Sequence, residues 1–159
     1  MPETSRKPRI GALGSDHAGL HIKETTRQFL ENSGYPVNDL GTGSEESVDY
    51  PDYGKAVGKS VADRKDDYGI AVCGTGIGMS IAANKVPKIR AAVAHDVSTA
   101  RLAREHNDAN VLSMGGRVVN GTLAIEMVQV FLNTPFQGGR HARRVEKIAL
   151  SEMEESNKH

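Results

Sequence analysis

The chain has only one cysteine, Cys73, among its 159 residues. A single thiol cannot form a disulfide within the chain, which fits a protein kept in a reducing compartment. Lysine and arginine together number 20, and so do aspartate and glutamate, so the net charge is zero. This balance provides no overall attraction to nucleic acid or to an anionic membrane surface, and any anion site has to come from local charge.

Long apolar segments are also lacking. No run approaches the roughly 20 apolar residues that cross a bilayer as a helix, and the opening residues, MPETSRKPR, lack the apolar core of a secretory signal. We therefore expect a cytoplasmic protein that binds neither nucleic acid nor membranes. The length and the absence of an internal repeat or low-complexity linker predict a single domain over residues 1–159, with a polar extension at 1–8.

Apolar runs of strand length alternate along the chain with segments of helical periodicity. The predicted strands are 9–14, 36–40, 68–73, 90–95 and 109–114, and the predicted helices are 19–32, 53–64, 78–85, 98–105, 122–132 and 139–155. This alternation predicts right-handed βαβ crossovers in an α/β fold. We expect a Rossmann-like, doubly wound domain with a five-stranded parallel sheet of order 2-1-3-4-5 and helices on both faces.

Ligands of such sheets bind beyond the carboxyl ends of the strands, where the strand order reverses. Asp16 and His17 follow the first strand, and Cys73 ends the third. In the expected order these two strands flank the reversal, so the three side chains should face one crevice. His95, which closes the fourth strand, is a candidate for the pocket wall.

The segment CGTGIG follows the third strand and opens a predicted helix. Its alternating glycines differ from the dinucleotide fingerprint G-x-G-x-x-G, and no Walker lysine follows them. Such glycines allow successive amides to point at one small anion, helped by the dipole of the following helix. The simpler interpretation is a tight strand-to-helix turn. The amides expected to form an oxyanion nest belong to Gly74, Thr75, Gly76, Ile77 and Gly78.

Cys73 itself has two interpretations. A lone cysteine at a strand end is commonly a small buried hydrophobe. Beside a helix amino terminus and an anion nest, however, a thiol is favoured as the thiolate and can act as nucleophile or general base. We favour the catalytic interpretation. The sequence has none of the paired ligand spacing of zinc sites, so we expect no metal.

His106 lies next to Asn107, just before the fifth strand. Histidine is the side chain best suited to proton transfer near neutral pH, so His106 is a candidate acid or base. Capping of the preceding helix is the equally simple alternative.

Several cations suggest a phosphate site. Arg140 and Arg144 are four residues apart at the start of the last helix, so they share a face and form a fork that suits a phosphate. Arginines on a terminal helix commonly just face solvent. Together with Arg117, after the fifth strand, and His17, they indicate a phosphorylated small molecule.

Six segments carry a resemblance to a known family: GSDHAG (14–19), DYPDY (49–53), CGTGIGMSIAANK (73–85), REHNDANVL (104–112), GGRVV (115–119) and GGRHARRV (138–145). From Ile10 to about Ile148 the chain resembles type B ribose-5-phosphate isomerase, whose family includes the galactose-6-phosphate isomerase subunits. The resemblance implies interconversion of ribose 5-phosphate and ribulose 5-phosphate in the pentose phosphate pathway, without metal or cofactor. It also implies homodimers, or tetramers of them, in which the C-terminal helix reaches a neighbouring subunit.

The resemblance implies roles for individual residues. Cys73 moves a proton between C1 and C2 of the sugar, and His106 opens the furanose ring as acid and base. The amides of residues 74–78 hold the cis-enediolate oxygens, with Thr75 able to relay a proton between them. The implied substrate contacts are Asp16, His17, Asn107, Arg117, Arg140 and Arg144, the last two from the neighbouring subunit, with Tyr50, His95 and His141 as possible pocket walls.

Two positions separate this chain from parts of that family. Met79 occupies the place of a glutamate base in one branch, and because methionine cannot take a proton, the chain falls on the cysteine branch. Gly116 stands where serine or alanine is expected. A six-carbon substrate, such as allose 6-phosphate or galactose 6-phosphate, is the nearer alternative, and a non-catalytic nucleotide-binding domain of similar fold is the more distant one.

Overall fold

The computed structural model describes residues 7–158, and its core is one parallel five-stranded sheet. The strands are β1 (Ile10–Ser15), β2 (Val37–Gly41), β3 (Gly69–Cys73), β4 (Ala91–Val93) and β5 (Val111–Gly115). The helices are the short 3₁₀ helix η2 (His17–Gly19), α1 (Leu20–Asn32), α2 (Tyr50–Ala62), α3 (Ile77–Asn84), α4 (Val97–Asn107), α5 (Gly121–Asn133) and α6 (Arg140–Ser156). This is the doubly wound α/β class that the sequence predicts.

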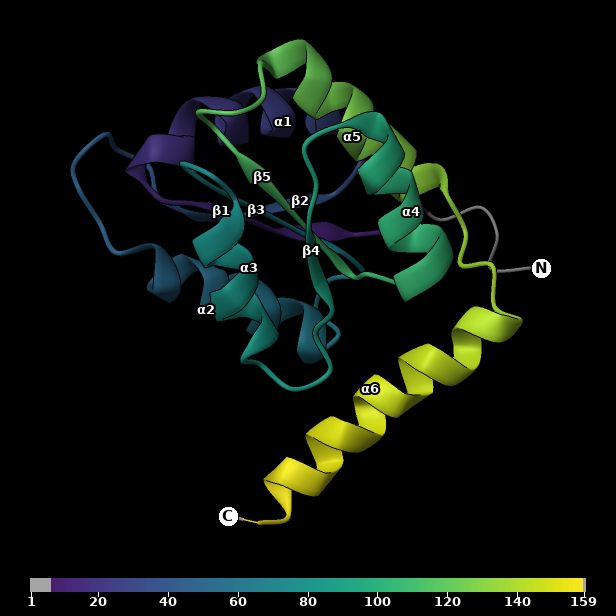
Figure 1. The fold of residues 1–159 in the computed structure, drawn as a ribbon. Helices are drawn as coiled ribbons and strands as arrows, with labels where there is room; N and C mark the ends of the chain where they lie inside the picture. Colours follow the sequence, from purple (N-terminus) through teal and green to yellow (C-terminus); the bar gives the residue numbers. More distant parts are fainter. Residues whose placement is uncertain (1–6, 159) are drawn as a thin grey trace.

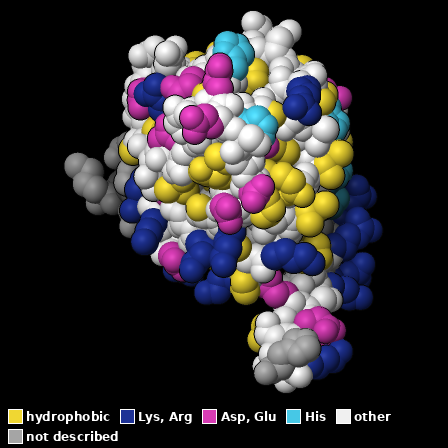
Figure 2. Space-filling view, turned by 90° about the vertical axis from the view of Figure 1, so that its left-hand side faces the viewer, with side chains coloured by type: hydrophobic (Ala, Val, Ile, Leu, Met, Phe, Trp, Pro, Cys, Tyr) yellow, Lys and Arg dark blue, Asp and Glu magenta, His cyan; other side chains and the backbone are white. Residues whose placement is uncertain are grey.

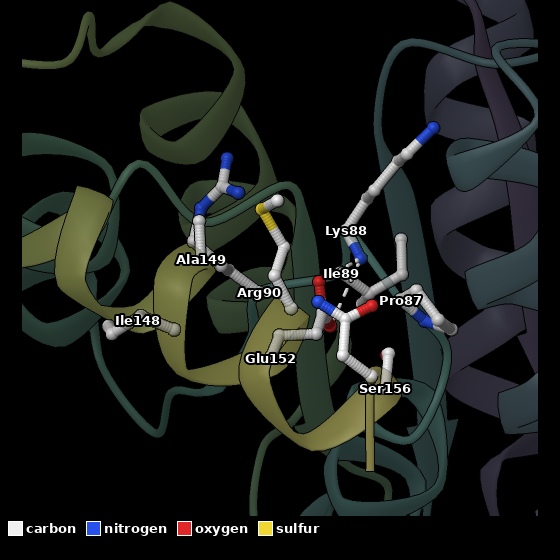
Figure 3. A pocket seen from close by; sticks show the side chains of 10 residues that line it. Pro87, Lys88, Ile89, Arg90, Ile148, Ala149, Glu152 and Ser156 are labelled. Carbon is white, nitrogen blue, oxygen red and sulfur yellow. Dashed lines mark hydrogen bonds between the residues drawn. The ribbon is translucent and has the colours of Figure 1, made fainter. Parts of the chain in front are cut away.

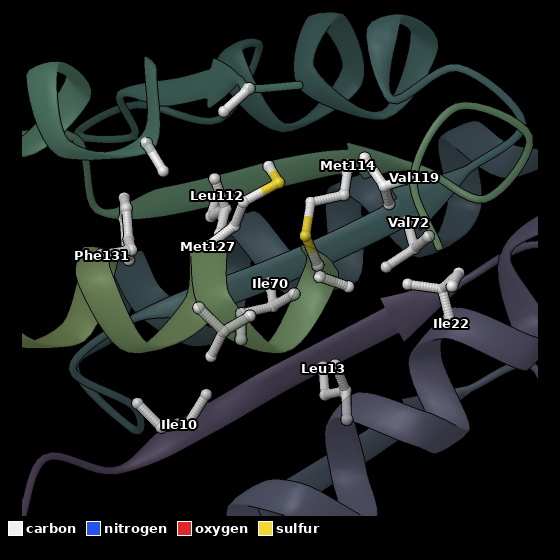
Figure 4. Close-up of a cluster of buried hydrophobic side chains, with 14 of the residues drawn as sticks. Ile10, Leu13, Ile22, Ile70, Val72, Leu112, Met114, Val119, Met127 and Phe131 are labelled. Carbon is white, nitrogen blue, oxygen red and sulfur yellow. The ribbon is translucent and has the colours of Figure 1, made fainter. Parts of the chain in front are cut away.

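Helices cover both faces of the sheet (Figure 1). Helices α1, α4 and α5 pack together on one face, while α2 and α3 pack on the other. Each face has its own cluster of buried side chains. Figure 4 shows the first cluster, in which Leu13, Ile70 and Leu112 from three adjacent strands meet Met127 and Phe131 of α5. Cys73 belongs to the second cluster, so the candidate base lies at the edge of a packed core.

The strand order is β2-β1-β3-β5-β4, so the predicted order 2-1-3-4-5 is wrong in its last two strands. Burial explains the exchange. All five residues of β5 are buried and pair with β3 and β4, whereas β4 has three half-buried residues and pairs with β5 alone. A short strand is better suited to the edge of a sheet. The reversal still lies between β1 and β3, because β1 pairs with β2 on one side and β3 on the other.

Helix α2 begins at Tyr50, three residues before the predicted start at residue 53. Pro51 misled the prediction, because proline is tolerated in the first turn of a helix, where its missing N–H has no partner to lose. Strand β4 is shorter than the predicted 90–95. Most of the predicted polar extension at 1–8 lies outside the described residues.

Helix α6 extends away from the body of the molecule, as Figure 1 shows. Its seventeen residues include Ile148, Leu150 and Met153, which are exposed by 52%, 48% and 59%. None of the helices within residues 7–158 is long and apolar enough to cross a membrane.

Candidate active site

A crevice of about 510 Å³ opens at the carboxyl ends of β1 and β3. This is the place where the strand order reverses, as expected for a sheet of this kind. The side chains and backbone that line it come from η2, α2, α3 and the loops after β3 and β5: Asp16, His17, Ala18, Tyr50, Cys73, Gly74, Thr75, Ile77, Gly78, Ile81 and Arg117.

Cys73 lies at the base of the crevice and is 4% exposed. The amide of Gly76 donates a hydrogen bond to its Sγ atom over 3.2 Å. The thiol also lies three residues before Gly76, the residue that precedes the first turn of α3. Both the Gly76 N–H and the amino terminus of α3 therefore direct partial positive charge toward the sulfur atom.

The loop between β3 and α3 is held in one conformation by close packing. Gly76 has φ of 82°, a left-handed conformation that side chains rarely adopt, and a Cβ there would meet the carbonyl carbon of Met114 at 2.8 Å. A Cβ on Gly115 would likewise meet the backbone of Thr75 at 2.7 Å. Glycine at these positions lets the loop lie directly on β5.

The loop also presents free backbone donors. Within residues 7–158, the amides of Gly74, Thr75 and Gly78 donate to no protein acceptor. The amide of Ile77 donates to Thr75 Oγ1 over 3.2 Å. Unpaired amides beside a helix amino terminus are suited to bind an oxyanion, as the glycine pattern predicts.

Asp16 and His17 are held by backbone contacts on the other wall. Asp16 is buried and caps η2, accepting the Gly19 amide over 3.0 Å. His17 Nδ1 accepts the Val48 amide over 3.2 Å. Because Nδ1 is an acceptor, the proton of the neutral ring lies on Nε2, which is then a hydrogen-bond donor for a ligand.

The remaining side chains form the rim of the crevice. Arg117 lies against Gly74, where a Cβ would meet its guanidinium nitrogen at 3.1 Å, and a Cβ on Gly78 would meet the Tyr50 ring at 2.6 Å. Tyr50, Ile77 and Ile81 are exposed by 42%, 52% and 56%. Figure 2 views the side of the molecule at which the strands end, and hydrophobic side chains gather there beside acidic ones. The rim thus combines a cation with an apolar surface.

His106 lies at the opposite end of the strands from the crevice. It is near the end of α4, and β5 begins four residues after that helix ends, so His106 lies at the amino ends of the strands. Its ring stacks on that of His141, with centroids 4.2 Å apart and planes 13° apart. The Gln137 amide donates to the carbonyl of Glu105 over 3.1 Å and so holds the start of α6 at this end.

His141 is buried against His106 and is 6% exposed. Burial lowers the pKa of His141 below its usual value of 6.5, and His106, Arg140 and Arg144 lower this pKa further by charge repulsion, while Glu105 opposes them. Arg140 and Arg144 are exposed on the first turns of α6. The end of the molecule at which the strands begin therefore holds a stacked histidine pair and two exposed arginines.

The structure brings part of the predicted site together and leaves part of it apart. The crevice contains Asp16, His17, Tyr50, Cys73, Arg117 and residues 74, 75, 77 and 78, while Gly76 lies buried beneath them. The predicted residues that do not line it are His95, His106, Asn107, Arg140, His141 and Arg144. His95 is exposed beyond β4, where its amide donates to Thr99 Oγ1 over 3.3 Å.

Two further hollows lie along α6, away from Cys73. One, of about 380 Å³, is formed by α6 and the segment before β4 (Figure 3). In it the Glu152 carboxylate accepts the Lys88 amide over 3.0 Å. The neighbouring hollow, of about 770 Å³, contains Asn107. Within residues 7–158, no group of three His, Cys, Asp or Glu side chains could hold a metal ion.

The sequence reasoning missed four contributors, the first of which is Ala18 of η2, which lines the crevice. Ile81 lines the crevice, and its position four residues after Ile77 could have indicated this, because the two share a helix face. Val48 holds His17 through its amide, and Ser113 donates to the Gly76 carbonyl from β5. No sequence pattern indicated these two contacts.

The chain matches known proteins over most of its length. Residues 12–148 match the family model described as Ribose/Galactose Isomerase. Ribose-5-phosphate isomerase B of Escherichia coli is 46% identical, covering 89% of this chain and 95% of its own. D-erythrulose-4-phosphate isomerase of Pectobacterium atrosepticum is 41% identical, covering 92% and 97%.

A solved structure agrees with these sequences. Ribose-5-phosphate isomerase B of Clostridium thermocellum superimposes with a TM-score of 0.90 at 53% identity, covering 92% of this chain and 98% of that one. The crevice lies at the reversal of strand order, where doubly wound sheets bind ligands. The residues that match the family model include His17, Cys73 and His106. The chain belongs to the ribose/galactose isomerase family.

Proposed function

We propose that this protein interconverts D-ribose 5-phosphate and D-ribulose 5-phosphate. The observation that carries the proposal is the Gly76 amide donating to Cys73 Sγ at the base of a crevice with free backbone amides. Proton abstraction next to a carbonyl needs a base and a place for the developing negative charge, and this arrangement supplies both. The names of the E. coli and C. thermocellum relatives support the same reaction.

In the proposed reaction the opened aldose lies with C1 and C2 against Cys73. The thiolate takes the proton from C2, and the electrons move to O1 to form a cis-enediolate. Amides of residues 74–78 hold its oxygens, and Thr75 passes the O2 proton to O1. The Cys73 thiol then returns its proton to C1, which gives the ketose and restores the thiolate.

We further propose that the complete site needs two subunits. His106 and Arg140 lie near the amino ends of the strands, whereas Cys73 lies at their carboxyl ends. In a twofold dimer, the surface around Cys73 of each copy can face the surface around His106 of the other copy, so that both sites are completed. The phosphate would meet His17 and Arg117 of one subunit and the Arg140–Arg144 fork of the other, while His106 opens the ring.

Complementation between inactive subunits tests this arrangement. Cys73→Ala and His106→Ala are each expected to be inactive alone. After unfolding and joint refolding of equal amounts, about half of the dimers are mixed and each has one intact site, so about a quarter of wild-type activity should return. If the mixture stays inactive while a wild-type plus Cys73→Ala mixture keeps its share of activity, the shared site is wrong.

Sugar length is the open part of the specificity. The family description includes galactose, and the Pectobacterium relative is named for a four-carbon substrate. A second candidate function is therefore isomerisation of a four- or six-carbon sugar phosphate by the same chemistry. Comparison of kcat/KM for ribose 5-phosphate, allose 6-phosphate, galactose 6-phosphate and erythrulose 4-phosphate decides between them.

A further inference from the structure

Ser113 is a fully buried polar residue at the middle of the sheet. It lies on β5, between Ala71 of β3 and Val93 of β4, and has no exposed surface. A hydroxyl at such a position lowers stability unless it is hydrogen-bonded, and an alanine would avoid that cost. The hydroxyl therefore calls for an explanation in terms of its partner.

The partner is the carbonyl of Gly76, which accepts from Ser113 Oγ over 2.5 Å. Gly76 is the left-handed residue of the loop after β3, and its own amide donates to Cys73 Sγ. The same carbonyl also accepts the Ser80 amide, a bond of the first turn of α3. Gly76 thus connects the thiol, helix α3 and strand β5.

A glycine needs such restraints more than other residues do. Without a Cβ its φ and ψ are less restricted, so the direction of its amide is set by what its neighbours hold. Packing of Gly115 against Thr75 fixes the peptide before Gly76, and the Ser113 hydroxyl fixes the peptide after it. Fixed donors favour the charged state of a reaction because they need no reorganisation.

We propose that Ser113 is a positioning residue for the thiol: by holding the Gly76 carbonyl, it aims the Gly76 amide at Cys73 Sγ. Its importance for turnover rests on the function proposed above for Cys73, whereas its effect on the thiol does not. The substitution Ser113→Ala removes the hydroxyl and keeps the strand.

Two measurements test the assignment. In Ser113→Ala, kcat for ribose 5-phosphate is expected to fall about fivefold to tenfold with KM within about twofold, as for the loss of one hydrogen bond that acts on the reacting group. The alkylation rate of Cys73 by iodoacetamide at neutral pH is expected to fall by a similar factor, because the Gly76 amide is no longer held toward the sulfur. Since Cys73 is the only cysteine, the modified site is unambiguous.

Ser80→Ala is the matched control. Ser80 Oγ donates to the Ile77 carbonyl over 3.0 Å, so this change also removes a buried hydroxyl-to-carbonyl bond at the start of α3 but leaves the Gly76 carbonyl held. It should keep both kcat and alkylation rate. If Ser80→Ala loses as much as Ser113→Ala, the effect belongs to the helix terminus in general and the assignment is wrong.

Other outcomes are equally decisive. Ser113 is not a positioning residue if, in a variant with wild-type circular dichroism, either kcat or the alkylation rate stays at the wild-type value. If the wild type isomerises no sugar phosphate, the proposed function falls, and the alkylation rates of the two variants alone decide on Ser113.

Discussion

The two groups of candidate catalytic residues are built in different ways. Around Cys73 the groups are mainly backbone amides, the thiol and Asp16 are buried and hydrogen-bonded within the same chain, and Arg117 and Tyr50 are exposed only at the rim. Around His106 they are side chains on helix ends, and the two arginines there are exposed. Within residues 7–158, the first region is held by contacts of its own chain, whereas the two arginines of the second face solvent.

This difference indicates how the reaction divides between the two regions. In the proposed reaction, the negative charge of the enediolate needs fixed hydrogen-bond donors, and the backbone amides that follow β3 provide them. Phosphate binding and ring opening tolerate long, charged side chains on a helix, because these can adjust to the ligand. We therefore expect substitutions in the Cys73 region to lower kcat and substitutions in the Arg140–Arg144 region to raise KM.

The largest expected effect comes from Cys73→Ala. Loss of the base should lower kcat by about a hundredfold to ten-thousandfold. Binding of ribose 5-phosphate, measured by calorimetry, should change little, because the proposed phosphate contacts lie elsewhere. Cys73→Ser keeps a side chain of similar size but replaces the thiol with a hydroxyl, so it tests whether the thiolate itself is needed. This variant should be nearly as inactive as Cys73→Ala. Turnover by Cys73→Ala at the wild-type rate would remove Cys73 from the mechanism.

A smaller effect is expected from Arg144→Ala. Removing one charged phosphate contact should raise KM about tenfold while kcat falls less. Arg143→Ala is the matched control, because Arg143 is an exposed arginine on the same helix that projects about 100° away from Arg144 around the helix axis. An unchanged KM for Arg144→Ala would mean that this arginine only faces solvent. The proposal that the Arg140–Arg144 region binds the phosphate would then be wrong.

The sequence was sufficient for most of the fold and for the Cys73 region. Alternation of strands and helices gave the parallel sheet, and glycine spacing gave the loop that contacts Cys73, because both follow from local rules. The order of β4 and β5 was not predictable in the same way, since it depends on which strand buries more surface. The separation of His106 from Cys73 follows from the same local rules, because the helix of a βαβ crossover runs back to the amino ends of the strands and His106 lies just before β5.

The smallest expected effect concerns the stability of the His106 region. The pKa of His141 is lowered in the folded protein by burial and by His106, Arg140 and Arg144, with Glu105 opposing. The folded state therefore binds protons at His141 less readily than the unfolded chain does, and stability falls as pH drops through the usual value of 6.5. This contribution is fully present above that pH and is lost at acidic pH.

His141→Gln removes the titrating group and should reduce this acid sensitivity. The expected result is a smaller decrease in melting temperature between pH 7.5 and pH 5 in the variant than in the wild type, even if the variant is less stable at pH 7.5. His21→Gln is the control, because His21 is exposed on α1 and should leave the pH dependence unchanged. If His141→Gln loses as much stability on acidification as the wild type, burial and charge repulsion in the His106 region do not oppose protonation of His141. The His106 region would then differ from the Cys73 region in the exposure of its arginines, but not in any resistance to protonation.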